Sequence, residues 1–149
     1  NYSKKFYFKD IYNKLLMNKI FNKEYVSLIE LLKKTIEEIC NILEINTKII
    51  MSSSLKKLNF KGQDRIINIV QQLNGTKYVN FLGGAKIYDS KAFKENNIEL
   101  CFLKSKLADM KFNNTDYFIT NLSILEILMN FDLKFILNNY LNEFTLVQV

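Results

Sequence analysis

The chain contains no histidine among its 149 residues. Because Ser-His-Asp and Cys-His catalytic arrangements both need an imidazole, nucleophilic catalysis of these kinds is excluded within this chain. Acid-base catalysis by histidine is excluded for the same reason. A zinc site would have to be built from two cysteines and from carboxylates alone. We therefore predict neither a metal ion nor a cofactor.

Cysteine is also scarce, and its two positions favour a structural role. Cys40 lies in an apolar pattern of helical period, and Cys101 lies in an apolar strand pattern. Each is more typical of a small core residue than of a redox or metal-binding group. We expect no disulfide, because thiols of cytosolic proteins stay reduced.

Long apolar runs, proline and tryptophan are absent as well. No run reaches the roughly 18 apolar residues that a membrane-spanning helix needs. The first residues lack the apolar core and the small-residue cleavage site of a signal peptide, so we place the chain in the cytoplasm. No linker-like or charge-rich block divides the sequence, and its length suits one domain over residues 1–149.

The charge balance does not identify a partner. Lys and Arg number 21 against 15 Asp and Glu, which gives a net charge of +6. All the basic residues except Arg65 are lysines, spread along the chain rather than clustered in a stripe. Nucleic-acid binding depends on such clusters, so we predict no nucleic-acid partner.

Apolar residues recur at helical spacing near both ends of the chain. We predict one helix between Phe6 and Leu16 and a second over about 23–43. The second is expected to bury its apolar face, which comprises Leu28, Leu32, Ile36, Ile39 and Leu43. Near the C-terminus, Ser123 with Glu126 fits a capping box for a helix through Met129, and Asp132 fits the cap of a last helix to about Tyr140.

The middle of the chain reads as alternating strands and helices. We predict strands at 48–51, 77–81 and 99–102, a helix from Gly62 or Gln63 to Asn74-Gly75, and a short helix after Ser90. Such alternation with compact connections is typical of a parallel sheet. The predicted fold is a small two- or three-layer α/β domain with a short parallel sheet of about three strands and five to six helices.

This topology predicts a binding edge, because ligands of open α/β folds bind where parallel strands end. Ser52, Ser53 and Ser54 follow the first predicted strand, together with Lys56 and Lys57. Gly83, Gly84, Lys86 and Tyr88 follow the second, and Lys104, Ser105 and Lys106 follow the third. Hydroxyl groups, glycine N–H groups and lysines favour an anionic ligand. We expect the serine triplet and the glycine pair to share one pocket.

Arg65 is the single arginine and lies in the first turn of the helix after the serines. A cation there opposes the helix dipole by about 0.3–1 kcal/mol, so another interaction should favour it. Asp64, the neighbouring residue, is poorly oriented to pair with it on the same helix. Two explanations stay open: an ion pair with a carboxylate of another element, and contact with a bound phosphate or carboxylate.

The remaining site candidates carry weaker signals. Gly83-Gly84 lacks the spacing of a dinucleotide-binding or P-loop motif. Tyr78 and Tyr88 can each orient a substrate hydroxyl or cover an edge of the core. Asp64 and Asp89 are the carboxylates nearest the predicted edge, and Asp64 is our candidate general base. Serine triplets most often form solvated turns that cap a helix.

Five segments in sequence resemble the WbqC-like family of bacterial proteins. They are SSL at 53–55, DRIINI at 64–69, YVNFLGGAKIYD at 78–89, Phe93 with NIEL at 97–100, and FITNLSILEIL at 118–128. Their order and approximate spacing agree over nearly the whole chain. The resemblance implies a role in making bacterial surface polysaccharide, O-antigen in particular, as a transferase that modifies a sugar.

The chain departs from the family pattern in four places; one is Lys111-Phe-Asn113, which stands where the family usually has a Tyr-x-Gln element. The family's N-terminal region with its Gln-Pro and Pro-Trp segments has no counterpart here, and we expect it to be missing. Thr120 stands where the family usually has proline, and Glu126 replaces the usual aspartate. If the missing region supplies part of the site, this chain binds ligand without catalysis.

Two hypotheses therefore stand. In the first, the chain is a cytoplasmic transferase for an anionic small molecule, either a nucleotide-sugar or a substrate linked to coenzyme A, with Arg65, Lys86 and loop N–H groups binding the anion. In the second, it is a non-catalytic interaction or subunit domain. Its aromatic residues Phe112, Tyr117 and Phe118 would then dock on a second copy, on another chain or on the missing region.

Overall fold

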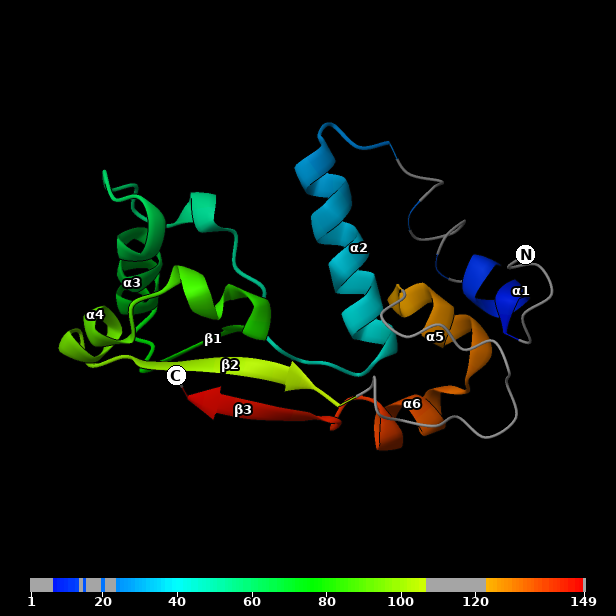
Figure 1. Ribbon diagram of the computed structural model, residues 1–149. Helices are drawn as coiled ribbons and strands as arrows, with labels where there is room; N and C mark the ends of the chain where they lie inside the picture. Colours follow the sequence, from blue (N-terminus) through cyan, green and yellow to red (C-terminus); the bar gives the residue numbers. More distant parts are fainter. Residues whose placement is uncertain (1–6, 14, 16–19, 21–23, 107–122, 149) are drawn as a thin grey trace. The chain divides into compact units, whose positions relative to one another are not determined.

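The computed structural model describes residues 7–13, 15, 20, 24–106 and 123–148 of the chain (Figure 1). They belong to two compact units. Unit 1 consists of Asn1–Ile49 and Leu107–Glu143, and unit 2 consists of Ile50–Lys106 and Phe144–Val149. Unit 2 is thus formed by the middle of the chain together with its last residues. The single domain over residues 1–149 stays a prediction. Phe112, Tyr117 and Phe118 lie outside the described residues.

Unit 1 is helical in its described part. Its helices are α1 (Phe8–Ile11), α2 (Leu28–Ile42), α5 (Ile124–Asn130) and α6 (Leu133–Asn139). The predicted caps of the last two helices are confirmed: Ser123 Oγ accepts from the N–H of Leu125, and Asp132 Oδ1 accepts from the N–H of Phe135. Buried side chains of α5, α6 and the residues just after α2 and α6 form one core, namely Leu43, Leu128, Ile136 and Tyr140.

The apolar face of α2 is largely exposed, in contrast to our prediction. Leu43 is buried and Ile39 packs against the core, as expected. Leu28, Leu32 and Ile36 are instead 69%, 52% and 52% exposed. Helical periodicity alone cannot distinguish a face that packs inside the chain from a face left open. The structure therefore corrects this part of the predicted core.

Unit 2 contains a three-stranded mixed sheet in the order β1-β2-β3. Strands β1 (Lys77–Phe81) and β2 (Glu99–Ser105) are parallel, with Tyr78 opposite Leu100 and Asn80 opposite Phe102. Strand β3 (Phe144–Gln148) runs antiparallel to β2, and Val147 lies opposite Phe102. The fold is therefore mixed α/β, as predicted, and its β1-β2 pair is the expected parallel pair.

Two details of the predicted sheet are wrong. Among the described residues, 48–51 pair with no strand, so the serine triplet does not leave the end of a sheet strand. The third strand is β3, which the sequence analysis missed beyond the end of the last predicted helix. A short apolar run needs a partner to become a strand, and β2 takes the C-terminal residues as that partner.

The helices of unit 2 are α3 (Gly62–Gln72) and α4 (Ser90–Glu95), with two short 3₁₀ helices, η3 (Ser52–Ser54) and η4 (Leu82–Ile87). Helix α3 ends as predicted before Asn74-Gly75, although Asn74 rather than Gly75 takes the left-handed conformation, with φ 53°. Helix α4 is capped by Asp89, one residue earlier than the predicted Ser90.

The core of unit 2 forms where α3 and α4 cover one face of the sheet. Ile67 and Val70 of α3, Phe93 of α4, and Phe102 of β2 are buried together. Phe93 and Phe102 are fully buried, so the positions of both helices on β2 are fixed by large side chains. Cys101 is also buried, as expected of a core cysteine, whereas Cys40 in unit 1 is partly exposed. Among the described residues, no helix has the length and hydropathy to cross a bilayer.

Candidate functional site

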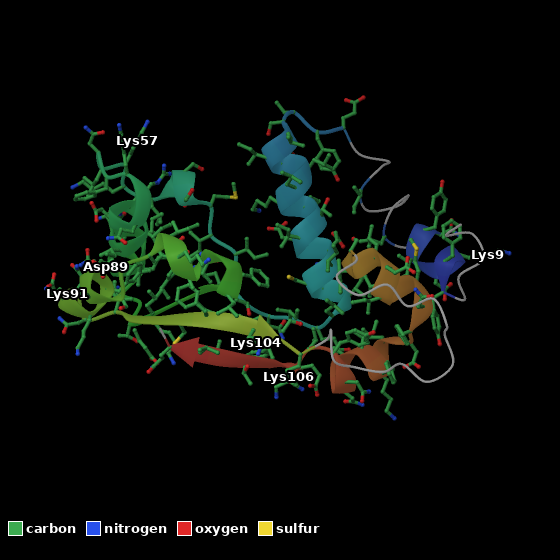
Figure 2. All side chains as sticks on the ribbon, viewed as in Figure 1. Lys9, Lys57, Asp89, Lys91, Lys104 and Lys106 are labelled. Carbon is green, nitrogen blue, oxygen red and sulfur yellow. The ribbon has the colours of Figure 1, made fainter. Side chains whose placement is uncertain are left out.

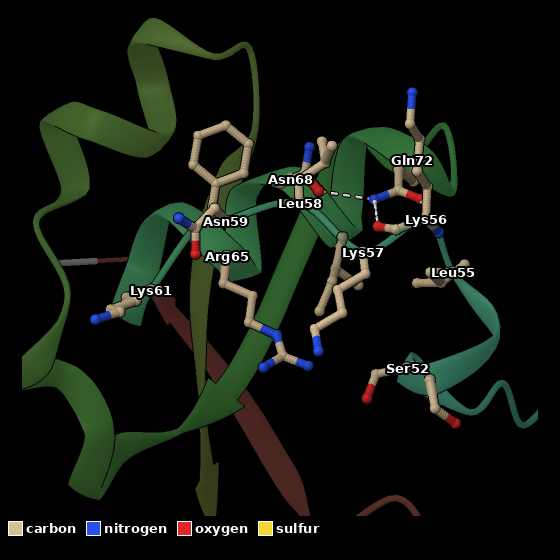
Figure 3. Close-up of a pocket in the computed structure, with 13 residues that line it drawn as sticks. Ser52, Leu55, Lys56, Lys57, Leu58, Asn59, Lys61, Arg65, Asn68 and Gln72 are labelled. Atoms are coloured by element: carbon tan, nitrogen blue, oxygen red, sulfur yellow. Dashed lines mark hydrogen bonds between the residues drawn. The ribbon is translucent and has the colours of Figure 1, made fainter.

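A hollow opens in unit 2 between α3 and the chain that leads into it. The segment from η3 to the start of α3 runs along the outer side of the helix (Figure 3). Gln72 near the end of α3 holds this segment in place. Its Nε2 donates to the carbonyl oxygen of Lys56 at 3.1 Å, and its Oε1 accepts from the N–H of Lys56 at 2.9 Å. A further bond joins Gln72 Nε2 to Asn68 Oδ1 at 2.7 Å.

The hollow has a volume of about 480 Å³. This volume lies within the range of small-molecule sites, about 300–1,000 Å³. None of the described residues that line it is Asp or Glu. They are Ser52, Ser53, Leu55, Lys56, Lys57, Leu58, Asn59, Phe60, Lys61, Arg65, Asn68, Ile69 and Gln72. The lining thus combines four cationic side chains with hydroxyl groups, amides and a few apolar side chains.

Two of the four cations extend into the hollow. Figure 3 shows the Arg65 guanidinium and the Lys57 side chain approaching the same space, with Ser52 on its opposite side, whereas Lys56 and Lys61 point outward. Among the described residues, the recorded ion pairs involve neither Arg65 nor Lys57. Two cations held close together without a carboxylate repel each other, and an anion between them would remove that cost.

This arrangement bears on the two explanations that the sequence left open for Arg65. In the part of the chain that the structure describes, no carboxylate of another element pairs with it. Asp64 is exposed and does not line the hollow. Arg65 is itself exposed, so water as well as a ligand can satisfy its guanidinium, and contact with a bound anion stays a prediction.

The three serines do not share one role, because Ser54 forms hydrogen bonds within η3. In η3, the hydroxyl of Ser54 donates to the carbonyl oxygen of Met51 at 2.7 Å, and its N–H donates to the same oxygen at 2.9 Å. Ser54 therefore acts in the local turn and does not line the hollow. Ser52 and Ser53 line it, as Arg65 does.

A second polar cluster lies on the helix-covered face of the sheet, where β1 ends. The phenol oxygens of Tyr78 and Tyr88 are 3.3 Å apart, and Asn80 Nδ2 donates to them at 3.2 Å and 3.0 Å. The amide orientation is fixed because Asn80 Oδ1 accepts from the N–H of Phe81 at 2.7 Å. Each of the two N–H bonds of the Asn80 amide donates to one phenol oxygen, and the O–H of one phenol donates to the other phenol. The O–H of the second phenol is therefore left to donate to another group.

Buried aromatic rings hold both phenols in position. The ring of Tyr78 stacks on Phe93 at a centroid distance of 5.7 Å and an angle of 12°, and Tyr88 meets Phe93 edge-on at 84°. Burial, followed by the hydrogen bond with Tyr88, raises the pKa of Tyr78 to about 12. Tyr78 therefore remains a neutral hydrogen-bond donor at physiological pH.

Of the two glycines, Gly84 belongs to this cluster, and neither lines the hollow. Both glycines lie in η4, and a side-chain Cβ at Gly84 would stand 3.3 Å from Asn80 Nδ2 and 3.5 Å from Tyr88. Glycine at this position lets the chain pass close to the amide and the phenol. A Cβ at Gly83 would meet nothing within 4 Å. Lys86, in the last turn of η4, is exposed.

The predicted site residues are thus found in two places. Ser53 and Arg65 line the hollow, while Tyr78, Tyr88 and Gly84 meet at the phenol cluster. The expectation of one shared pocket is not met, because none of the cluster residues lines the hollow. The two places are nevertheless linked within unit 2. Gln63 in the first turn of α3 accepts from the N–H of Asp89, directly after Tyr88, at 3.0 Å.

Asn80 and Phe60 are among the residues of these sites that the sequence analysis left unassigned. Asn80 is two positions from Tyr78 in a strand, so a strict period of two would have placed both on one face. Phe60 carried no signal at all, whereas Lys57 was placed at the predicted binding edge. Among the described residues, no group of three Cys, Asp or Glu side chains gathers as a metal site would require.

Comparison with protein families gives a match over most of the chain. The model of the WbqC-like protein family matches residues 1–135, which include the hollow, the phenol cluster and both helices α5 and α6 up to Phe135. No curated protein and no solved structure matches the chain.

Proposed function

The chain belongs to the WbqC-like protein family, and we propose that it acts in making bacterial surface polysaccharide by binding a phosphate-bearing substrate in the hollow beside Arg65. The observation that carries this proposal is the approach of Arg65 and Lys57 to one space lined by Ser52 and Ser53 but by no carboxylate. At about 4 Å near a protein surface, each cation attracts a unit negative charge by about 4 kcal/mol before desolvation is subtracted.

If the chain is a transferase, the residues near the hollow have the following proposed roles. The outward phenol O–H of the Tyr78-Asn80-Tyr88 cluster would orient an oxygen of the acceptor, because it is a neutral donor held in a fixed position. Asp64, in the same helical turn as Arg65, is the candidate general base. Lys86 is a further candidate for the anion. We propose the cytoplasm as the compartment, where activated sugar and acyl donors are made.

A thermal-shift experiment with inorganic pyrophosphate tests the proposal. A ligand at 100 times its dissociation constant stabilises a fold by about 2.7 kcal/mol, or roughly 5–10 °C for a cooperative unit of this size. Arg65→Gln should weaken binding roughly 10- to 100-fold, because a hydrogen bond to a charged group is worth about 1.5–3 kcal/mol.

The matched control is Lys104→Gln, which removes the same charge from an exposed position at the end of β2, outside the hollow (Figure 2). It should leave the shift unchanged. If pyrophosphate gives no shift with the wild-type chain, or if Lys104→Gln weakens binding as much as Arg65→Gln, the hollow is not a phosphate site.

A second candidate function, an interaction domain, is favoured by the open face of α2. Leu28, Ile29, Leu32 and Ile36 lie within an arc of about 100° on the helix and are 52–69% exposed. Exposed apolar stripes of this kind mark docking surfaces. Size-exclusion chromatography with light scattering at high concentration tests whether the partner is a second copy. Leu32→Lys should then shift an oligomer toward the monomer, and a strict monomer in the wild-type chain would rule out self-association.

A further inference from the structure

The hollow beside Arg65 is more than a basic patch, because it also has an apolar wall. Phe60 and Leu58 line it and are 47% and 40% exposed, and Leu55 and Ile69 line it as well. Inorganic phosphate has no apolar surface to place against such side chains. A ligand that satisfies the whole hollow must therefore carry both negative charge and a flat or apolar group.

The polar lining suggests how the charged part is held. The guanidinium of Arg65 is planar and presents paired N–H donors, which suit two oxygens of one phosphate. Lys57 supplies a separate point charge in the same space. Two neighbouring cations match a diphosphate better than a single phosphate. Hydroxyl groups of Ser52 and Ser53 and the amides of Asn59 and Asn68 complete the lining.

We propose that the hollow binds a nucleoside diphosphate, with the diphosphate at Arg65 and Lys57 and the base against Phe60. This inference rests on the proposed function and specifies its substrate class. Aromatic side chains stack on bases of every kind, because each base has a π-face. The volume of about 480 Å³ is sufficient for a group of this size.

A nucleoside diphosphate occurs in two kinds of donor, nucleotide-linked sugars and coenzyme A. The probes are therefore inorganic pyrophosphate, uridine, UDP and coenzyme A, each titrated into the wild-type chain by calorimetry. UDP, coenzyme A or both should bind at least 10-fold more tightly than pyrophosphate, while uridine should bind weakly. Tighter binding of UDP indicates a sugar donor, and tighter binding of coenzyme A indicates an acyl donor.

Phe60→Ala separates the base from the diphosphate. The variant should bind the preferred nucleotide about as weakly as pyrophosphate, with its binding of pyrophosphate unchanged. Phe81→Ala is the matched control, since Phe81 is 70% exposed at the end of β1 and does not line the hollow. It should bind all the probes like the wild-type chain.

Phe60→Trp allows binding to be followed by fluorescence while an aromatic side chain is kept at this position. The chain has no tryptophan, so the new indole would be its single fluorescent reporter of that kind. The preferred nucleotide should quench its emission, and pyrophosphate should not. If the nucleotides bind no more tightly than pyrophosphate, or leave this emission unchanged, the inference is overturned while the phosphate site stands. If pyrophosphate also fails to bind, the proposed function falls with it.

Discussion

Replacing Tyr78 with phenylalanine should remove a pH-dependent part of the stability of unit 2. The ring would still stack on Phe93, but the hydroxyl that meets Tyr88 and Asn80 would be lost. Loss of a hydrogen bond that leaves a partner unsatisfied costs about 1–3 kcal/mol, so Tyr78→Phe should lower the free energy of unfolding by about that amount near neutral pH.

The sign of the pH dependence follows from the raised pKa. The pKa of Tyr78 rises from 10.0 to about 12 on folding, so the folded state holds the phenol proton more strongly than the unfolded state. The resulting stabilisation is complete below about pH 10 and is lost as the pH rises through about 12. For a group shielded from solvent, a pKa change of this size contributes about 2.7 kcal/mol to the free energy of unfolding. Solvent screening at the half-buried Tyr78 reduces this contribution to about 1–2 kcal/mol.

Urea unfolding of the wild-type chain and of Tyr78→Phe, repeated from about pH 8 to about pH 12, measures this difference. We expect the gap in free energy of unfolding to shrink by about 1–2 kcal/mol across that range. Tyr12→Phe, a change in an exposed ring of unit 1, controls for the removal of any phenol. A gap that keeps the same size at every pH would refute the account of the phenol cluster.

Two further substitutions test how the sites are held, each by urea unfolding. Gly84→Ala should destabilise the chain by about 1–3 kcal/mol, because its Cβ would press on the amide of Asn80 at 3.3 Å, whereas Gly83→Ala should be near neutral; equal effects would argue against the close approach. Gln72→Ala should cost about 1–2 kcal/mol and also weaken pyrophosphate binding, since Gln72 fixes Lys56 and the wall of the hollow. Pyrophosphate binding unchanged in Gln72→Ala would show that this wall does not shape the site.

Local signals in the sequence predicted much of the fold. The start of α3, strand β1, and the caps Ser123 and Asp132 all depend on neighbouring residues, and all are confirmed. The pairing of β3 with β2 joins residues about 40 positions apart, and no local pattern reports such a contact. The exposure of Leu32 on α2 is likewise a property of packing rather than of periodicity.

The candidate site was predictable in its parts but not in its arrangement. Arg65, whose charge opposes the helix dipole, does line the hollow, and its contact with a ligand stays a prediction. The glycine pair was expected to join it, yet Gly84 instead makes room for Asn80 and Tyr88. That expectation depended on a strand at 48–51, and without this strand the serines reach α3 by a different path.

A crystal structure of the chain soaked with pyrophosphate is the most direct test of the central claim. The account predicts diphosphate density between the Arg65 guanidinium and the Lys57 ammonium group, within hydrogen-bonding distance of a serine hydroxyl of the hollow. Density at another place on unit 2, with the hollow empty at a saturating concentration, would contradict it.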